Sequence, residues 1–314
     1  MAMTAGRRSW LYSYTTLALV MLFWSGNFIV GRAVQGLVPP FTLAFVRWAG
    51  AALVLLPFAW RHVVADRAVL AAEWRSVLLL GITGVASFNA FIYAGLRYTT
   101  ATNGLLLQAA IPALVLLLNL VFFRQRSAPS QVAGVLLSII GVVTIVLRGD
   151  LLSLMSLDFN IGDLLVLCGV LSWAAYTSLL RLRPRCHPFS FLFACFLVGV
   201  AAMGPLALME AAGGARVQMG WGTFGAFAYV AILPSLVAYI LYNAAVQDIG
   251  AGPAGQTITL MPLFGALLAA SLLGEALHAY HLAGMVLILG GIVVAAVIGR
   301  RPSPEAVSGP GGRR

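Results

Sequence analysis

Asparagine and tyrosine recur with the same helical spacing in two distant parts of the chain. Asn89 and Tyr93 are four residues apart, and so are Tyr239 and Asn243. Residues four apart lie on one face of a helix, and both side-chain types donate and accept hydrogen bonds. Such a face could line a cavity that binds a small molecule, or it could join neighbouring helices through hydrogen bonds. We favour the cavity.

Two further segments combine aromatic rings with small polar groups. Trp24 and Asn27 lie in one segment, and Trp173 and Tyr176 lie in the other. Buried Trp and Tyr need partners for their N–H and O–H groups, which a hydrated cavity supplies. The alternative is the aromatic belt at the membrane surface. Because Trp24 and Trp173 each lie about 15 Å into an apolar stretch at 1.5 Å per residue, we expect all four residues to line the same cavity.

Arg47 and two prolines raise separate questions about this region. Arg47 could pair with a substrate carboxylate or extend its charge to the membrane surface, and its place near one end of an apolar stretch favours the surface. Pro112 and Pro262 each follow a run of polar residues. A proline frees the carbonyl four residues earlier and bends the helix. We expect these prolines to act as hinges, with ordinary packing kinks as the alternative.

The composition requires that membrane-spanning helices position these residues. The chain has 314 residues, of which 61% are hydrophobic and 9% charged, and the mean hydropathy is +0.97. This excludes a soluble enzyme, a disulfide-rich secreted fold and a DNA-binding protein. A span needs ~20 apolar residues. We therefore expect an all-α integral membrane protein whose ten transmembrane helices cover residues 11–34, 40–60, 74–96, 102–123, 130–147, 161–181, 188–209, 221–246, 252–274 and 279–299.

The two halves of the chain match each other at an offset of 148 to 150 residues. The matched pairs are Trp24 and Trp173, Pro40 and Pro188, Pro57 and Pro205, Pro112 and Pro262, Gly134 and Gly284, and Gly141 and Gly291. With five helices each, the halves must enter the membrane from opposite sides, as in alternating-access carriers. The predicted organisation is a cytoplasmic N-terminus (1–10), two inverted five-helix repeats (11–150 and 151–300) and a disordered cytoplasmic tail (301–314).

Arginine placement predicts the orientation of these repeats. All 19 basic residues are arginine, and the net charge is +10. Fourteen lie at the two termini and in the connections after the second, fourth, sixth and eighth stretches, whereas the remaining connections hold three. Positive residues concentrate on the cytoplasmic side, so we expect both termini in the cytoplasm. The positive charge then reflects topology, and we expect no nucleic-acid partner.

Several short motifs resemble those of the drug/metabolite transporter superfamily, EamA type. They are the Trp-Ser-Gly-Asn segment from Trp24 to Asn27, Leu273-Gly274-Glu275, and His281-Leu282-Ala283-Gly284. Within that superfamily the chain is most similar to the YddG-type bacterial exporters of aromatic amino acids. The resemblance implies a carrier in the bacterial inner membrane that exports small metabolites, neutral or aromatic amino acids in particular. A multidrug or other metabolite efflux carrier of the same fold is the alternative.

The acidic residues indicate how such a carrier would be driven. All nine fall at expected helix ends, in connections or in the tail, and none lies at mid-membrane. Proton-coupled carriers usually keep a carboxylate there, so we expect a facilitator driven by the substrate gradient. The chain also lacks a phosphate-binding Gly-x-x-x-x-Gly-Lys-Ser/Thr loop and the common hydrolase motifs.

These observations favour a transporter over an enzyme. The remaining alternative from another class is a channel or a lipid-handling membrane protein. We expect no cofactor and no metal, a small-molecule substrate and the lipid bilayer as partners, and a monomer or weak homodimer.

Overall fold

The computed structural model describes residues 10–34, 36–95, 98–99, 107–150, 160–273 and 277–298. The two expected cytoplasmic ends, apart from Trp10, lie outside these ranges, as does Glu275. Across the described ranges every regular element is helical. Nine of these helical stretches are long and apolar enough to cross a membrane, and Ile111–Phe123 is a shorter apolar helix. The prediction of an all-α integral membrane protein is confirmed at this level.

The helices follow one another in two series of similar order. The first comprises α1 (Trp10–Ala33), α2 (Pro40–Ala72), α3 (Trp74–Gly81), η1 (Ile82–Ser87), α4 (Phe88–Gly95), α6 (Ile111–Phe123) and α7 (Pro129–Val146). The second comprises α8 (Ile161–Leu179), η3 (Leu180–Leu182), α9 (Pro188–Ala212), α10 (Trp221–Ala231), η4 (Ile232–Val237), α11 (Ala238–Ile249), α12 (Ala251–Gln256), η5 (Thr257–Thr259), α13 (Leu260–Leu273), α14 (Ala279–Val293) and η6 (Val294–Ile298). Proline opens α2, α7 and α9, where its missing N–H is harmless and its fixed φ suits a helix.

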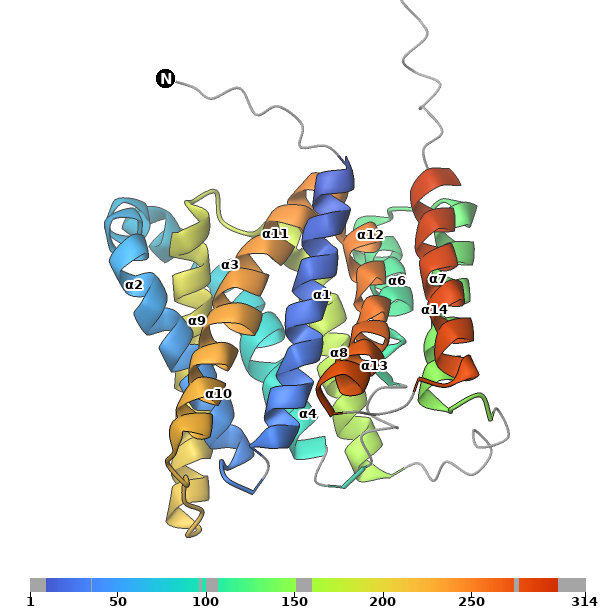
Figure 1. The fold of residues 1–314 in the computed structure, drawn as a ribbon. Coiled ribbons are helices and arrows are strands. Elements are labelled where there is room, and N and C mark those ends of the chain that lie inside the picture. The colour runs from blue at the N-terminus through green and yellow to red at the C-terminus, as the bar shows by residue number, and fades with distance from the viewer. Residues whose placement is uncertain are drawn as a thin grey trace, which may run out of the picture.

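The helices form one bundle (Figure 1). The first helix, α1, lies in front at the middle of this view and packs against α11 and α13, while α2 pairs with α9 at one side and α7 with α14 at the other. The beginning of α1 and the end of η6 lie at the same end of the bundle, the upper end in Figure 1.

Two expected helices are interrupted by a π-helical turn, and a third π segment, η6, ends the last described helix. The segments 74–96 and 221–246 were each predicted as uninterrupted helices, but η1 interrupts the first and η4 interrupts the second. Both turns begin at the same place in the repeat, because Ile82 and Ile232 are 150 residues apart. A π turn contains one extra residue, so backbone carbonyls near it become available to other partners.

The residues inside these turns differ between the two halves. Gly84 in η1 and Pro234 in η4 are also 150 residues apart. A Cβ atom on Gly84 would lie 2.3 Å from Cδ2 of Tyr176, so only glycine admits that ring. Pro234 has no N–H to donate, which disturbs the normal α-helical pattern. The two halves therefore reach the same irregular backbone through different residues.

The second helix is also longer than predicted. The sequence predicts an end at residue 60, whereas α2 continues to Ala72. Its 33 residues extend to about 50 Å, well beyond the ~30 Å of a hydrocarbon core. Hydropathy marks where the membrane ends, and the segment 61–72 contains no glycine or proline to end the helix there.

Both prolines predicted as hinges follow a break in a helix. Residues 109–110 form a turn before α6, which contains Pro112, and the short 3₁₀ segment η5 precedes α13, which contains Pro262. These breaks coincide at the offset of 150 residues. Each proline therefore follows an interruption of the α-helix, and the role of both as hinges stays a prediction.

Glycines bring α7 and α14 into backbone contact. A Cβ atom on Gly134 would lie 2.4 Å from the carbonyl oxygen of Gly291, and one on Gly141 would lie 2.7 Å from that of Gly284. The order of contacts reverses along the second helix, so the two helices are antiparallel. At the offset of 150 residues, Gly134 corresponds to Gly284 and Gly141 to Gly291. Gly134 thus contacts the counterpart of Gly141, and Gly141 contacts the counterpart of Gly134, as an approximate two-fold axis between the two helices requires. These four glycines thus serve contacts within the fold.

Candidate functional site

Six aromatic side chains, here called the aromatic cluster, pack together inside the bundle. They are Trp24 of α1, Trp48 of α2, Trp173 and Tyr176 of α8, and Tyr239 and Tyr242 of α11. The ring centroids of Trp24 and Trp173 lie 5.1 Å apart, and those of Trp48 and Tyr239 lie 5.3 Å apart, both in edge-to-face arrangement. Such pairs each contribute ~0.5–1.5 kcal/mol beyond burial. Every ring in the cluster is at most 8% exposed, so this conformation is closed at its centre.

The two π turns supply hydrogen-bond acceptors to this cluster. The indole N–H of Trp24 donates to the carbonyl oxygen of Pro234 over 2.9 Å, and the hydroxyl of Tyr239 donates to that of Gly84 over 2.6 Å. The irregular backbone of each half therefore binds a ring from the other half. This crossed arrangement fixes the rings at the meeting point of the two series of helices.

Polar contacts between α8 and α11 complete the cluster. The hydroxyl of Tyr176 donates to Oδ1 of Asn243 over 2.7 Å, and the hydroxyls of Thr177 and Tyr242 lie 3.0 Å apart. Two buried donors nearby, Nδ2 of Asn243 and Nε1 of Trp48, have no hydrogen-bond partner among the described residues. Unsatisfied buried polar groups are rare in folded proteins and call for an explanation.

Arg47 lies next to the cluster with its charge inside the bundle. Its Nε donates to Oγ of Ser235 over 2.5 Å, and its guanidinium carbon lies 4.7 Å from the ring centre of Trp48. Its terminal nitrogen Nη1 lies 3.4 Å from Oδ1 of Asn89, and its other terminal nitrogen, Nη2, lies 3.3 Å from the carbonyl oxygen of Pro234. Arg47 is only 6% exposed.

The prediction that Arg47 extends to the membrane surface was therefore wrong. The hydroxyl of Ser235 donates to the carbonyl oxygen of Val230, which leaves its lone pairs for the arginine. Together with the carbonyl of Pro234, this acceptor draws the side chain inward between α2 and η4. No acidic side chain within the described ranges pairs with the guanidinium, and its acceptors are all neutral.

Most of the residues predicted to line a cavity come together in this region. They are Trp24, Asn89, Trp173, Tyr176, Tyr239 and Asn243, all of them buried. Tyr93 packs against the same core while partly exposed, and Asn27 is partly exposed on α1. For neither does the described part of the chain provide a hydrogen-bond partner.

Four residues of the site were missed or misplaced by sequence reasoning. Arg47 was assigned to the surface, and Trp48, Ser235 and Tyr242 were not considered. Helical spacing could have indicated Tyr242, because it lies three residues after Tyr239 on the same face. Ser235 carries no comparable signal, since the π turn alone brings it toward Arg47.

The two asparagines serve different purposes in the closed structure. Nδ2 of Asn89 donates to the carbonyl oxygen of Val85 in its own helical segment over 2.8 Å, while its Oδ1 receives Arg47. Asn243 joins α11 to α8 through Tyr176. The interhelical alternative therefore describes the bonds of Asn243 to Tyr176, of Tyr239 to Gly84 and of Asn89 to Arg47, while Nδ2 of Asn243 has no partner among the described residues.

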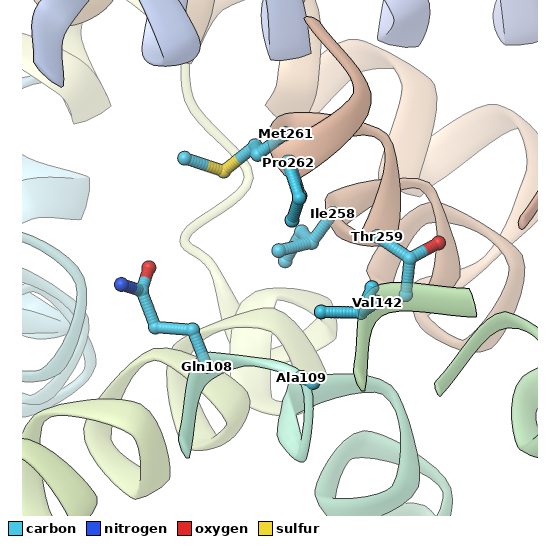
Figure 2. Close-up of a pocket in the computed structure, with 7 residues that line it drawn as sticks. All are labelled: Gln108, Ala109, Val142, Ile258, Thr259, Met261 and Pro262. Carbon is cyan, nitrogen blue, oxygen red and sulfur yellow. The ribbon is translucent and has the colours of Figure 1, made fainter. Parts of the chain in front are cut away.

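A small cavity lies beside the break that precedes Pro262. Figure 2 shows Gln108 and Ala109 on one side of it, Val142 on another, and Ile258, Thr259, Met261 and Pro262 on a third. Its volume of about 20 Å³ is close to what one water molecule occupies. The hydroxyl of Ser25 donates to the carbonyl oxygen of Met261 over 2.9 Å, which connects α1 to this kinked region.

A separate set of polar side chains joins α2 to the beginning of α9. The imidazole rings of His62 and His187 stack with centroids 3.6 Å apart, and Oδ2 of Asp66 accepts from the backbone N–H of His187 and the hydroxyl of Ser190. Burial lowers the pKa of His187, and His62 lowers it further, while Asp66 opposes both effects. The connection before α9 is thus attached to the extended part of α2.

Long apolar helices around a buried polar and aromatic centre define a multi-pass membrane protein of the transporter type. The model of the EamA-like transporter family matches residues 11–147 and again residues 160–297. The chain therefore belongs to the EamA-like transporter family. This confirms the resemblance to the EamA type of transporter found in the sequence, whereas the resemblance to aromatic amino acid exporters stays a prediction.

Several relatives match along nearly their full length. An "Uncharacterized transporter" of Archaeoglobus fulgidus is 31% identical over 282 residues, covering 89% of this chain and 96% of the relative. The "Uncharacterized transporter YyaM" of Bacillus subtilis is 25% identical, covering 92% and 95%. A "Probable amino-acid metabolite efflux pump" of Salmonella typhimurium is 26% identical, covering 88% and 92%. A solved crystal structure with 20% identity superposes with a TM-score of 0.76, covering 92% of this chain and 98% of the other, which shows the fold.

Proposed function

We propose that the chain is a secondary carrier that exports small metabolites, neutral or aromatic amino acids above all, across the bacterial inner membrane. The observation that carries the proposal is the aromatic cluster, where rings from both series of helices meet around polar groups. Ring faces suit an apolar or aromatic side chain, and neutral amide and hydroxyl groups suit a zwitterion. The relative named an amino-acid metabolite efflux pump supports this substrate class.

The carrier would work by alternating access between two inverted five-helix repeats. Three observations support this arrangement: the family model matches each half, the π turns recur after 150 residues, and the glycine contacts between α7 and α14 cross over. In such carriers the substrate site lies between the repeats. Opening of the closed cluster would require bending at the breaks before Pro112 and Pro262.

The driving force would be the substrate gradient rather than ATP or protons. The described acidic residues lie toward the ends of helices or in connections: Asp66, Glu73, Asp150, Asp163, Glu210 and Asp248. Asp163, the most buried of them, belongs to the capping box that begins α8. These positions support a facilitator. We further propose cytoplasmic termini and a monomer or weak homodimer.

Counterflow in liposomes tests the carrier function. Liposomes holding the purified protein and one unlabelled compound are diluted into the labelled form, with and without a pH gradient. A carrier should accumulate label transiently above its external concentration, whereas a channel or lipid-handling protein should not. Neutral amino acids, organic cations and nucleosides are compared, and preference for cations would favour a multidrug carrier instead. Protein-free liposomes provide the control.

A further inference from the structure

The charge of Arg47 has no acidic counterpart among the residues that the structure describes. The side chain belongs to α2 and meets Trp48 of its own helix, Asn89 of α4, and Pro234 and Ser235 of η4. All these groups are neutral. An isolated buried cation is strongly unfavourable, and charges kept inside membrane proteins usually serve a ligand or an ion path.

The hydrogen-bonding capacity of the guanidinium is only partly used. Arginine has five N–H donors, and three acceptors are described for Arg47. The bond to Ser235 is short, but those to Asn89 and Pro234, at 3.4 and 3.3 Å, lie beyond the usual 2.7–3.2 Å range. The two terminal nitrogens, which can bind a carboxylate in parallel, are therefore held weakly.

Two nearby side chains also carry hydrogen-bond donors without an acceptor. Nε1 of Trp48 and Nδ2 of Asn243 are buried and have no acceptor within the described part of the chain. Trp48 lies directly against the guanidinium, and the rings of Tyr239 and Tyr176 extend from Trp48 toward Asn243. The region around Arg47 and the aromatic cluster therefore has more hydrogen-bond donors than acceptors. An ionised carboxylate, which only accepts hydrogen bonds, would supply what is missing.

We propose that Arg47 binds the carboxylate of the transported molecule, with the aromatic cluster around its apolar body. This inference rests on the proposed carrier function and narrows its substrate to carboxylates. An ammonium group finds no acidic partner in the described residues of the cluster and can at most lie against a ring face. The carboxylate is therefore required, and the amino group is dispensable.

A matched series of phenyl compounds separates these requirements in the wild-type protein. Binding of L-phenylalanine, 3-phenylpropionate and L-phenylalaninamide to detergent-purified protein is measured by calorimetry, with phenyl phosphate as a further anion. We expect the two carboxylates to bind and the amide to bind at least tenfold more weakly. Equal binding of the acid and its amide would overturn the proposal, as would tighter binding of phenyl phosphate than of both carboxylates.

Substitution then tests whether Arg47 itself makes the distinction. Arg47→Met should weaken carboxylate binding at least tenfold and abolish the preference for acid over amide, while Arg47→Lys should retain part of both. Arg61→Met, an exposed arginine of the same helix, is the matched control and should change neither. Because Arg47→Met removes an unpaired buried charge, the melting temperature of this variant should equal or exceed that of the wild-type protein. A lower melting temperature with unchanged ligand preference would show a purely structural role and overturn the assignment.

The proposal and the underlying carrier function fail in different ways. Carboxylate-dependent binding that requires Arg47, without any counterflow, would refute the carrier and retain the site. Counterflow of amides or amines that is equally fast in Arg47→Met would refute the site and retain the carrier.

Discussion

The hydroxyl of Tyr176 donates a hydrogen bond to Oδ1 of Asn243 across 2.7 Å. Both residues are almost fully buried, at 0% and 3% exposure. This bond fixes which way the amide of Asn243 faces, so its Nδ2 has a defined position beside the aromatic cluster. An amide held by one end and unsatisfied at the other is prepared to bind a further acceptor.

Removing this hydrogen bond should destabilise the protein measurably. Tyr176→Phe leaves Oδ1 of Asn243 buried without its donor, and such a group costs about 1–3 kcal/mol. Thermal unfolding in detergent should show a lower melting temperature for Tyr176→Phe. Tyr98→Phe, at a tyrosine that is 63% exposed, should leave it unchanged, and an equal effect of both would contradict the role of the buried bond.

Transport should depend on the cluster more than on exposed aromatic residues. Tyr239→Ala removes a ring that contacts Trp24, Trp48 and Trp173 and frees the carbonyl of Gly84. We expect at least a tenfold loss of counterflow at equal amounts of folded protein, and a smaller loss for Tyr93→Ala.

Trp74→Ala is the control for this comparison, because that ring is 53% exposed and fits the aromatic belt. Trp10→Ala should behave in the same way. Equal activity of all four variants would contradict the assignment of the site.

The contact between α7 and α14 should not tolerate a methyl group. In Gly284→Ala the new Cβ would lie 2.4 Å from Cγ1 of Ile145 and 2.7 Å from the carbonyl oxygen of Gly141, so the backbones must separate. Overpacking of this kind costs about 1–3 kcal/mol. Gly265→Ala introduces no contact within 4 Å and should stabilise its helix by up to ~1 kcal/mol. Melting temperatures that move in the same direction would refute this packing argument.

Stability should fall in mild acid because of the histidine pair. The pKa of His187 is below its usual 6.5 in the folded protein, so the unfolded chain binds the proton more readily. The stabilisation is present above about pH 6.5 and is lost as the pH falls toward the lowered pKa. His187→Asn, which can still cap α9, should show a flatter pH dependence between pH 7.5 and 5.5. His278→Asn, at an exposed histidine, should keep the wild-type slope.

The orientation can be tested with fusion reporters. Fourteen arginines on one side against three on the other predict cytoplasmic termini. A reporter that is active only in the periplasm should be inactive when fused after Arg301. The same reporter inserted after Arg216 should be active, and the reverse pattern would overturn the orientation.

The sequence predicts the spans well because hydropathy is a sum over about twenty residues, and single errors cancel. It does not predict where a helix continues past the membrane, as α2 does, because helix ends depend on local capping and not on apolarity. The π turns and the position of Arg47 depend on single contacts. Tyr176 against Gly84 and Ser235 against Arg47 join residues from distant parts of the chain, and no local pattern records such contacts.

The recurrence at 150 residues, which the match of the family model to each half supports, accounts for part of the predicted site. It pairs Asn89 with Tyr239, which are both among the six buried residues, and it pairs Tyr93 with Asn243, of which only Asn243 is. Symmetry gave no indication for Arg47, because the offset of 148 residues that relates Pro40 to Pro188 and Pro57 to Pro205 pairs it with Cys195, a buried apolar residue. The charge is a feature of one half alone, and its burial had to be observed.

The π turns η1 and η4 also determine in which direction the side chains of the following helices, α4 and α11, point relative to the helices before the turns. One residue of an α-helix corresponds to a rotation of about 100°. Deleting one residue within Ile82–Ser87 would restore ordinary α-helix and rotate Asn89 by that angle relative to the helix before it; the same deletion within Ile232–Val237 would rotate Tyr239. The side chains would then face a neighbouring helix or lipid although the sequence around them is unaltered. Chain length in these two short turns is therefore as decisive for the centre of the protein as the identity of the rings.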